Sequence, residues 1–126
     1  MSALQCPARL FVARSGGAQA LAAALRGERI ARVWCGPLPP SVATAETVAA
    51  VLGVGVEVRE GLRRLRLDGG PPAVLEEVAD EHRGEAVLVV GDEHTLPDAG
   101  YVELEVDADG WRLVRREPAP TTDCRS

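Results

Sequence analysis

The sequence predicts a single α/β domain of three layers, with a mostly parallel sheet, helices on both faces and a C-terminal β-hairpin. Three observations support this fold class. Apolar runs of strand length alternate along the chain with segments of helical periodicity. The run at 85–90 is almost uninterruptedly apolar, which is typical of a strand buried on both faces. The turn signal Asp107-Ala108-Asp109-Gly110 separates the last two apolar segments and predicts the hairpin.

The first half of the chain supplies the start of this alternation. A run of apolar residues predicts a strand at 8–13. The alanine-rich segment 17–26 is predicted to be a helix, because Leu21 and Leu25 are four residues apart and therefore share one face. A second strand is predicted at 30–35, before a Gly-Pro pair that ends it.

A second helix and a short edge strand follow. Ser41 is a plausible N-cap for a helix that runs to about residue 52, and Gly53 supplies its C-terminal stop. Valines alternate with other residues at 54–59, which predicts a short strand at the edge of the sheet.

The second half completes the sheet. Pro71-Pro72 occupies the positions where proline is tolerated at a helix start, and an apolar face predicts that the helix continues to about Arg83. After the buried strand at 85–90, the hairpin strands are predicted at 101–106 and 111–115. Residues 1–117 then form the domain, and the Pro/Thr-rich segment 118–126 is expected to be a disordered tail.

Composition excludes several classes of function. At 126 residues and 46% hydrophobic content the chain is long enough for one modest core. The net charge is −5, with no block of basic residues interleaved with aromatics, so nucleic-acid binding is not expected. No run is long and apolar enough for a membrane span, and no signal peptide is recognised, so a cytoplasmic location is expected. Cys6, Cys35 and Cys124 have unrelated spacings, which favours reduced thiols over a disulfide framework or a zinc site.

The stretch Leu10-Phe11-Val12-Ala13-Arg14-Ser15-Gly16 carries the strongest functional signal. It resembles the opening strand L-x-x-V-R-H-G of the histidine phosphatase superfamily, the phosphoglycerate mutase-like proteins. Three further stretches resemble the same family in the same order. They are 17–25, similar to G-x-Q-A-x-x-L-A; 35–46, similar to S-S-P-L-x-R-A-x-Q-T-A-E; and 86–92, similar to V-L-V-V-[SG]-H.

The resemblance implies a phosphatase fold in which the reactive side chains are replaced. Ser15 stands at the position of the phosphorylated histidine, Pro40 at that of a phosphate-binding arginine, and Asp92 at that of the second histidine. The R-H-G and G-x-Q-A motifs also run together, without the segment that family members place between them. The chain is therefore identified as a truncated and degenerate member. Its remaining ligand-binding positions would be Arg14, Ser15 and Gly16, and no catalytic residue is assigned.

Physical chemistry leads to the same expectation. Phosphoryl transfer to a side chain needs a nucleophile that is neutral and basic near pH 7, as imidazole is and an unassisted serine hydroxyl is not. It also needs cations and N–H donors around the phosphate oxygens. Arg14 alone would face the carboxylate of Asp92 at the ends of neighbouring strands, with residues 35–40 as the adjoining wall.

Several other residues could take part in chemistry, but each has a simpler interpretation. His94 could be brought back toward Ser15, alone or with Asp92 as a hydrolytic triad, but a histidine in a surface loop is the more usual case. Asp92, Glu93 and His94 could bind a metal weakly, although a solvated acidic turn is favoured and no metal site is assigned. Cys35 is interpreted as a small buried hydrophobe. His82 is interpreted as part of a solvated, charged helix end.

Three functions remain open at this point. The first is a non-catalytic histidine phosphatase-like protein with a regulatory or interaction role. The second is a residual phosphomonoester phosphatase that uses a non-standard site. The third is a binding module for a small molecule or a protein partner on an α/β scaffold. No cofactor is expected for any of them.

Overall fold

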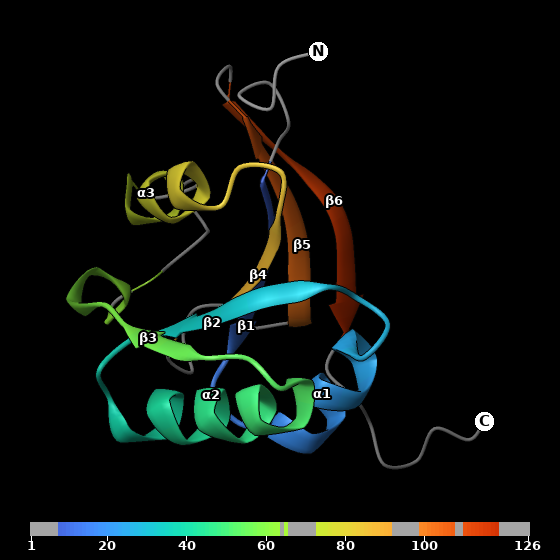
Figure 1. Ribbon diagram of the computed structural model, residues 1–126, viewed down its shortest axis with the longest axis vertical. Helices are drawn as coiled ribbons and strands as arrows, with labels where there is room; N and C mark the ends of the chain where they lie inside the picture. The colour runs from blue at the N-terminus through green and yellow to red at the C-terminus, as the bar shows by residue number, and fades with distance from the viewer. Residues whose placement is uncertain (1–7, 64, 66–72, 92–98, 108–109, 119–126) are drawn as a thin grey trace.

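The computed structural model describes residues 8–63, 65, 73–91, 99–107 and 110–118. Strands and helices alternate through most of this range (Figure 1). In chain order the elements are β1 (Ala8–Arg14), α1 (Ala18–Leu25), β2 (Ile30–Cys35), α2 (Pro39–Leu52), β3 (Val56–Val58), the 3₁₀ turn η2 (Glu60–Leu62), α3 (Ala73–Glu81), β4 (Ala86–Gly91), β5 (Ala99–Asp107) and β6 (Gly110–Pro118).

The strands form one six-stranded sheet in the order β3-β2-β4-β1-β5-β6. Strands β1 to β4 run parallel, β5 pairs antiparallel with β1, and β6 pairs antiparallel with β5. The predicted fold class is therefore confirmed: a mostly parallel sheet is extended at one edge by the C-terminal hairpin. A helix lies in each connection between successive parallel strands, because a chain that joins parallel strands must cross from one end of the sheet to the other.

Both faces of the sheet are covered, because successive side chains of a strand point to opposite faces. Helices α1 and α2 lie on one face, and α3 lies on the other (Figure 1). In β1, Phe11 and Ala13 belong to the core under α1 and α2, whereas Leu10 and Val12 belong to the core under α3. Every residue of β4 is buried, as the apolar run predicted.

The start of α2 differs from the prediction. The helix begins at Pro39 with Leu38 as its N-cap residue, and no side chain caps it. Proline fits the first turn because the N–H that it lacks would have no partner within the helix there. Ser41 is therefore inside the helix, so its prediction as the N-cap was wrong. The C-terminal stop at Gly53 is confirmed, since Gly53 adopts the left-handed conformation with φ 74°.

The hairpin is longer than its apolar pattern indicated. Strand β5 begins at Ala99 and β6 extends to Pro118, with a register shift opposite Glu103 and Leu104. Backbone pairing does not require apolar side chains, so residues beyond the apolar segments still join the ladder. Residues 119–126 and the Pro71-Pro72 helix start lie outside the described residues.

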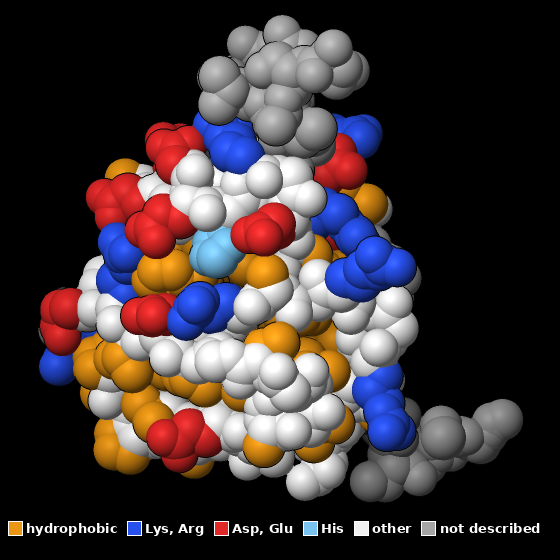
Figure 2. Space-filling model, in the orientation of Figure 1, with side chains coloured by type: hydrophobic (Ala, Val, Ile, Leu, Met, Phe, Trp, Pro, Cys, Tyr) orange, Lys and Arg blue, Asp and Glu red, His pale blue; other side chains and the backbone are white. Residues whose placement is uncertain are grey.

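The interpretation of His82 as a solvated residue is wrong. His82 is only 9% exposed and follows α3 on the sheet face that this helix covers. Its Nε2 atom accepts a hydrogen bond from the indole Nε1–H of Trp34 at 3.0 Å, and its Nδ1 atom lies 2.9 Å from Glu85 Oε1. Because Nε2 is the acceptor, Nδ1 carries the proton and donates to Glu85. Figure 2 shows acidic and basic side chains mixed on this side of the molecule.

Candidate functional site

The carboxyl ends of three neighbouring parallel strands meet at one edge of the sheet. Arg14 at the end of β1 pairs in register with Gly91 at the end of β4, and Cys35 at the end of β2 pairs with Val90. This edge is where α/β folds place ligand sites. Asp92 follows Gly91 in the sequence but lies outside the described residues, so its predicted position opposite Arg14 stays a prediction.

A glycine turn carries the chain from this edge into α1. Gly16 and Gly17 have positive φ values of 99° and 63°, which side chains with a Cβ rarely adopt, so the turn needs glycine. The Gly16 N–H donates to Thr44 Oγ1 at 2.9 Å. The Thr44 hydroxyl in turn donates to the Pro40 carbonyl oxygen at 2.9 Å. Thr44 thus ties the turn after β1 to the first turn of α2.

The start of α2 is tied to β4 in a similar way. The buried Ser41 hydroxyl donates to the Gly91 carbonyl oxygen at 3.0 Å. The side chain of Pro40, one residue earlier, is exposed. Pro39 and Pro40 have no N–H, so two of the first three positions of the helix offer no donor to an anion. The Thr44 and Ser41 hydroxyls thus connect the segments at the carboxyl edge of the sheet. The start of α2 offers few backbone N–H groups to a ligand there.

The absence of a side chain at Gly36 allows η2 to approach the end of β2 closely. A Cβ atom at Gly36 would lie 2.9 Å from the Leu62 carbonyl oxygen, which is closer than real Cβ contacts. Only glycine therefore allows the 3₁₀ turn to pack against this loop. The segment 35–40, which was predicted to adjoin the site, therefore packs against η2 at Gly36.

Cys35 is fully buried, in agreement with its interpretation as a small hydrophobe. Burial raises the pKa of the thiol to about 11, and the negative charge of Glu46 acts in the same direction. The thiolate is the reactive form of cysteine. Cys35 is consequently a protonated, inert thiol at neutral pH and not a nucleophile for this edge.

The predicted site residues are only partly brought together by the described structure. Arg14 and Ser15 are half-buried and adjoin Gly16 on one turn, which reaches Pro40 through Thr44. Of the two histidines in the chain, His82 is held against Trp34, and His94 lies outside the described residues. Within the described ranges, no group of three His, Cys, Asp or Glu side chains could hold a metal ion.

The polar tethers of this edge were not singled out by the sequence analysis. Thr44 lies within the stretch that resembles T-A-E, so a signal was present, although the motif does not state what the hydroxyl binds. Nothing in the sequence indicated that Ser41 would donate to β4, because that contact joins residues 50 positions apart.

Comparison with known proteins finds one partial match to a family model and several solved structures of similar fold. The family model of the histidine phosphatase superfamily (branch 1) matches residues 16–68. The chain shares its fold with the phosphoglycerate mutase from Plasmodium falciparum, at a TM-score of 0.67 and 11% identity over 96% of this chain and 97% of that chain. The family model matches one part of the chain, and the solved structure shows a shared fold. No curated protein matches the sequence.

Two further solved structures share the fold of this chain. YhfR from Bacillus stearothermophilus has a TM-score of 0.69 at 14% identity, over 86% of this chain and 96% of that chain. The protein histidine phosphatase SixA, complexed with tungstate, has a TM-score of 0.65 at 16% identity, over 88% of this chain and 97% of that chain. The family-model match includes Gly16, Pro40 and Thr44, and it begins after Arg14 and Ser15.

Proposed function

We propose that this chain is a non-catalytic histidine phosphatase-like protein that uses the fold as a scaffold for a regulatory or protein-binding role. One observation carries the proposal. In the motifs that resemble the superfamily, Ser15, Pro40 and Asp92 stand where histidine, arginine and histidine are expected. None of these replacements supplies a basic nucleophile or a cation for a phosphoryl group.

The hydrogen bonds of the sheet edge support this proposal. Catalysis of phosphoryl transfer depends on donors that point at the transferring group. The Gly16 N–H already has Thr44 as its acceptor, and Pro39 and Pro40 have no N–H to offer. A phosphate at this edge would therefore meet fewer free donors than a helix start usually provides.

The placement of His82 gives further support. A histidine elsewhere in a chain can replace a lost one only if its imidazole reaches the site. His82 lies on the α3 face, where Trp34 donates to one ring nitrogen and Glu85 lies beside the other. This imidazole is occupied as part of the core and contributes nothing to the edge at Arg14.

The proposal depends on replaced side chains and not on lost length. The structural matches extend over 95 to 97% of the compared chains. The shortened loops inferred from the motif spacing therefore stay a prediction. A cytoplasmic location belongs to the proposal as well, and the unpaired, buried thiol of Cys35 is in keeping with it.

Steady-state hydrolysis of an aryl phosphate tests the proposal directly. The full chain should show no turnover above a buffer blank, and the variants Ser15→Ala and His94→Ala should give the same result. All three proteins are purified identically, so that a contaminating phosphatase would appear equally in each. Turnover by the wild-type chain that is lost in His94→Ala would overturn the proposal and establish a residual phosphomonoester phosphatase with a non-standard site.

A further inference from the structure

A cavity lies at the opposite edge of the sheet from Arg14 and Ser15. It has a volume of about 480 Å³ and opens between the turn after α1 and the turn before β4, beside the start of β1. Its lining includes Arg9, Glu28, Arg29 and Glu85. The volume falls within the range of small-molecule sites, roughly 300–1,000 Å³. The proposed function does not involve this edge.

Two glycines give the cavity its open walls. Gly27 and Gly84 both line it, one in each of the two turns. Gly84 has a positive φ of 79°, which favours glycine and keeps a side chain out of the space. A Cβ atom at Gly27 would meet no atom within 4 Å, so the space beside it is empty. The backbone of both turns is therefore accessible to a ligand.

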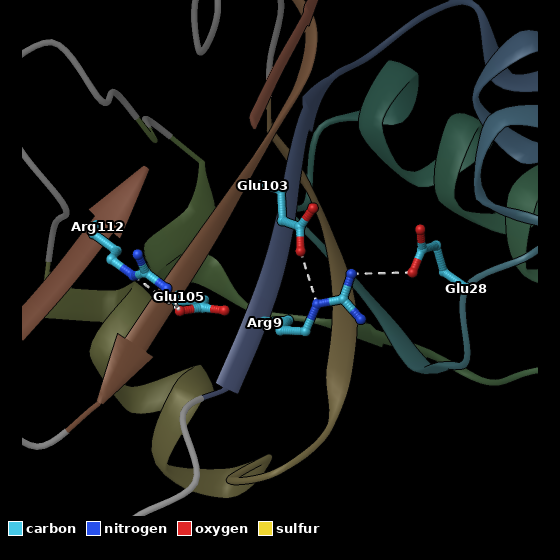
Figure 3. A network of polar contacts seen from close by, with 5 residues as sticks. All are labelled: Arg9, Glu28, Glu103, Glu105 and Arg112. Carbon is cyan, nitrogen blue, oxygen red and sulfur yellow. Dashed lines mark hydrogen bonds and ion pairs between the residues drawn. The ribbon is translucent and has the colours of Figure 1, made fainter. Parts of the chain in front are cut away.

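Arg9 presents a fixed positive group to this cavity. Its Nε atom donates to Glu103 Oε2 at 2.7 Å, and its Nη2 atom donates to Glu28 Oε1 at 3.0 Å. The bond to Glu103 is the main cause that raises the pKa of Arg9 above its usual value. Figure 3 shows the remaining terminal nitrogen directed away from both carboxylates. The guanidinium is thus oriented by two partners while one nitrogen stays available.

The other charges of the lining are of both signs. Arg29 is exposed and forms no ion pair with any residue in the described part of the chain. Glu85 uses one carboxylate oxygen, Oε1, for His82. A purely anionic ligand would meet the carboxylates of Glu28 and Glu85, and a purely cationic ligand would meet two guanidinium groups. A ligand with both a carboxylate and an ammonium group would complement both sets of charges.

We propose that this cavity is a binding site for a small zwitterion of the α-amino-acid class. The ligand's carboxylate contacts Arg29 and the open nitrogen of Arg9, and its ammonium group contacts Glu85. The turn backbones at Gly27 and Gly84 surround it. The site would give the scaffold a ligand of its own, at the edge opposite Arg14 and Ser15.

Amide chemical shifts of the ¹⁵N-labelled full chain test the site at the atoms that line it. L-glutamine is the probe, because its side chain is uncharged and only the zwitterion carries charge. Acetate and methylammonium at matched ionic strength are the single-charge controls. Glutamine should produce saturable shifts at the amides of Gly27 and Gly84, whereas neither control should do so.

A pair of variants completes the test. Arg29→Gln removes the proposed carboxylate partner and should weaken glutamine binding at least tenfold. Arg26→Gln is the matched control, because Arg26 is an exposed arginine of the same turn that does not line the cavity. Both residues are exposed, so the remaining amide spectrum should stay unchanged. Shifts that do not saturate, that acetate reproduces, or that the two variants affect equally would overturn the proposal.

Discussion

Burial determines the chemistry of the one cysteine in the described structure. Cys35 ends β2 at the same edge of the sheet as the ends of β1 and β4, and the charge that acts on its thiol is the negative one of Glu46. Desolvation disfavours its thiolate and raises the pKa to about 11, with Glu46 adding to the shift. The same residue type on an exposed, positively charged helix start would be reactive. At the residue scale, the environment and not the amino acid decides what this position can do.

Alkylation by iodoacetamide should reveal this inert thiol. In a Cys6→Ser, Cys124→Ser background, Cys35 should react much more slowly at pH 8 than a free thiol does, because almost none of it is thiolate. Rates measured from pH 7 to 10 should keep rising without a plateau. A plateau near pH 8 would contradict the assignment.

The raised pKa also predicts how stability depends on pH. The pKa of the folded thiol is about 11, whereas the unfolded thiol has the ordinary pKa of 9.0. The unfolded state therefore binds fewer protons between these values, and the contribution of Cys35 to stability is lost as pH rises through this window.

At the element scale, α3 is held to the sheet by a polar and aromatic clamp. Trp34 of β2 donates its indole N–H to His82. The guanidinium of Arg59 lies 4.7 Å from the centre of the Trp34 ring, and its nitrogens pair with Glu77 and Glu81 of α3. The surface ion pairs add little by themselves. The buried hydrogen bond matters more, because its loss leaves an indole N–H without a partner in the core.

The variant His82→Ala measures the strength of this clamp. It should lower the free energy of unfolding by about 1–3 kcal/mol, the usual cost of an unsatisfied buried donor. Adding Trp34→Phe removes that donor, so the double variant should lose less stability than the two single variants predict together. Urea denaturation followed by far-UV circular dichroism gives both values.

An exposed position on the same helix provides the control. Glu76→Ala should change stability by no more than about 0.5 kcal/mol, as is usual for surface substitutions. Additive effects of His82→Ala and Trp34→Phe would show that the hydrogen bond contributes nothing. The hydrogen bond would also be shown to contribute nothing if His82→Ala lowered the free energy of unfolding no more than Glu76→Ala does.

At the scale of the whole molecule, the sheet topology separates two edges with different chemistry. The carboxyl ends of β1, β2 and β4 lie together because these strands are parallel neighbours. Their amino ends form the other edge, where Arg9 joins β1 to β5 through Glu103 and to the turn after α1 through Glu28. Figure 3 also shows a separate pair between β6 and β5, in which Arg112 donates to Glu105 at 2.6 Å.

Restoring the superfamily residues tests the arrangement of the carboxyl edge. The triple variant Ser15→His, Pro40→Arg, Asp92→His should gain a phosphate-dependent rise in melting temperature, because a cationic site binds the dianion in the folded state alone. The wild-type chain should show little change in phosphate relative to chloride at equal ionic strength.

The matched control replaces the arginine by a neutral residue. The variant Ser15→His, Pro40→Gln, Asp92→His should show a clearly smaller phosphate effect. If the triple variant responds to phosphate no more than the wild-type chain, these three positions do not converge, and the motif alignment on which the proposed function depends is wrong.

Local patterns in the sequence determined most of the fold. Strand 30–35 was predicted with the bounds of β2, because its apolar run ends at a glycine and a proline that break any regular element. The buried character of β4 and the glycine stop of α2 followed from the same kind of local signal. These features depend only on residues that are close in the sequence, so the sequence alone was sufficient to predict them.

Only the tertiary structure decided what the polar side chains contact. Ser41 resembled an N-cap but donates to Gly91, and His82 resembled a solvated helix end but accepts from Trp34. The cavity beside Arg9 likewise joins segments that are distant in sequence. The contacts of Ser41 and His82 join residues 50 and 48 positions apart. Their partners are determined by the pairing of strands across the sheet. Local periodicity contains no information about that pairing.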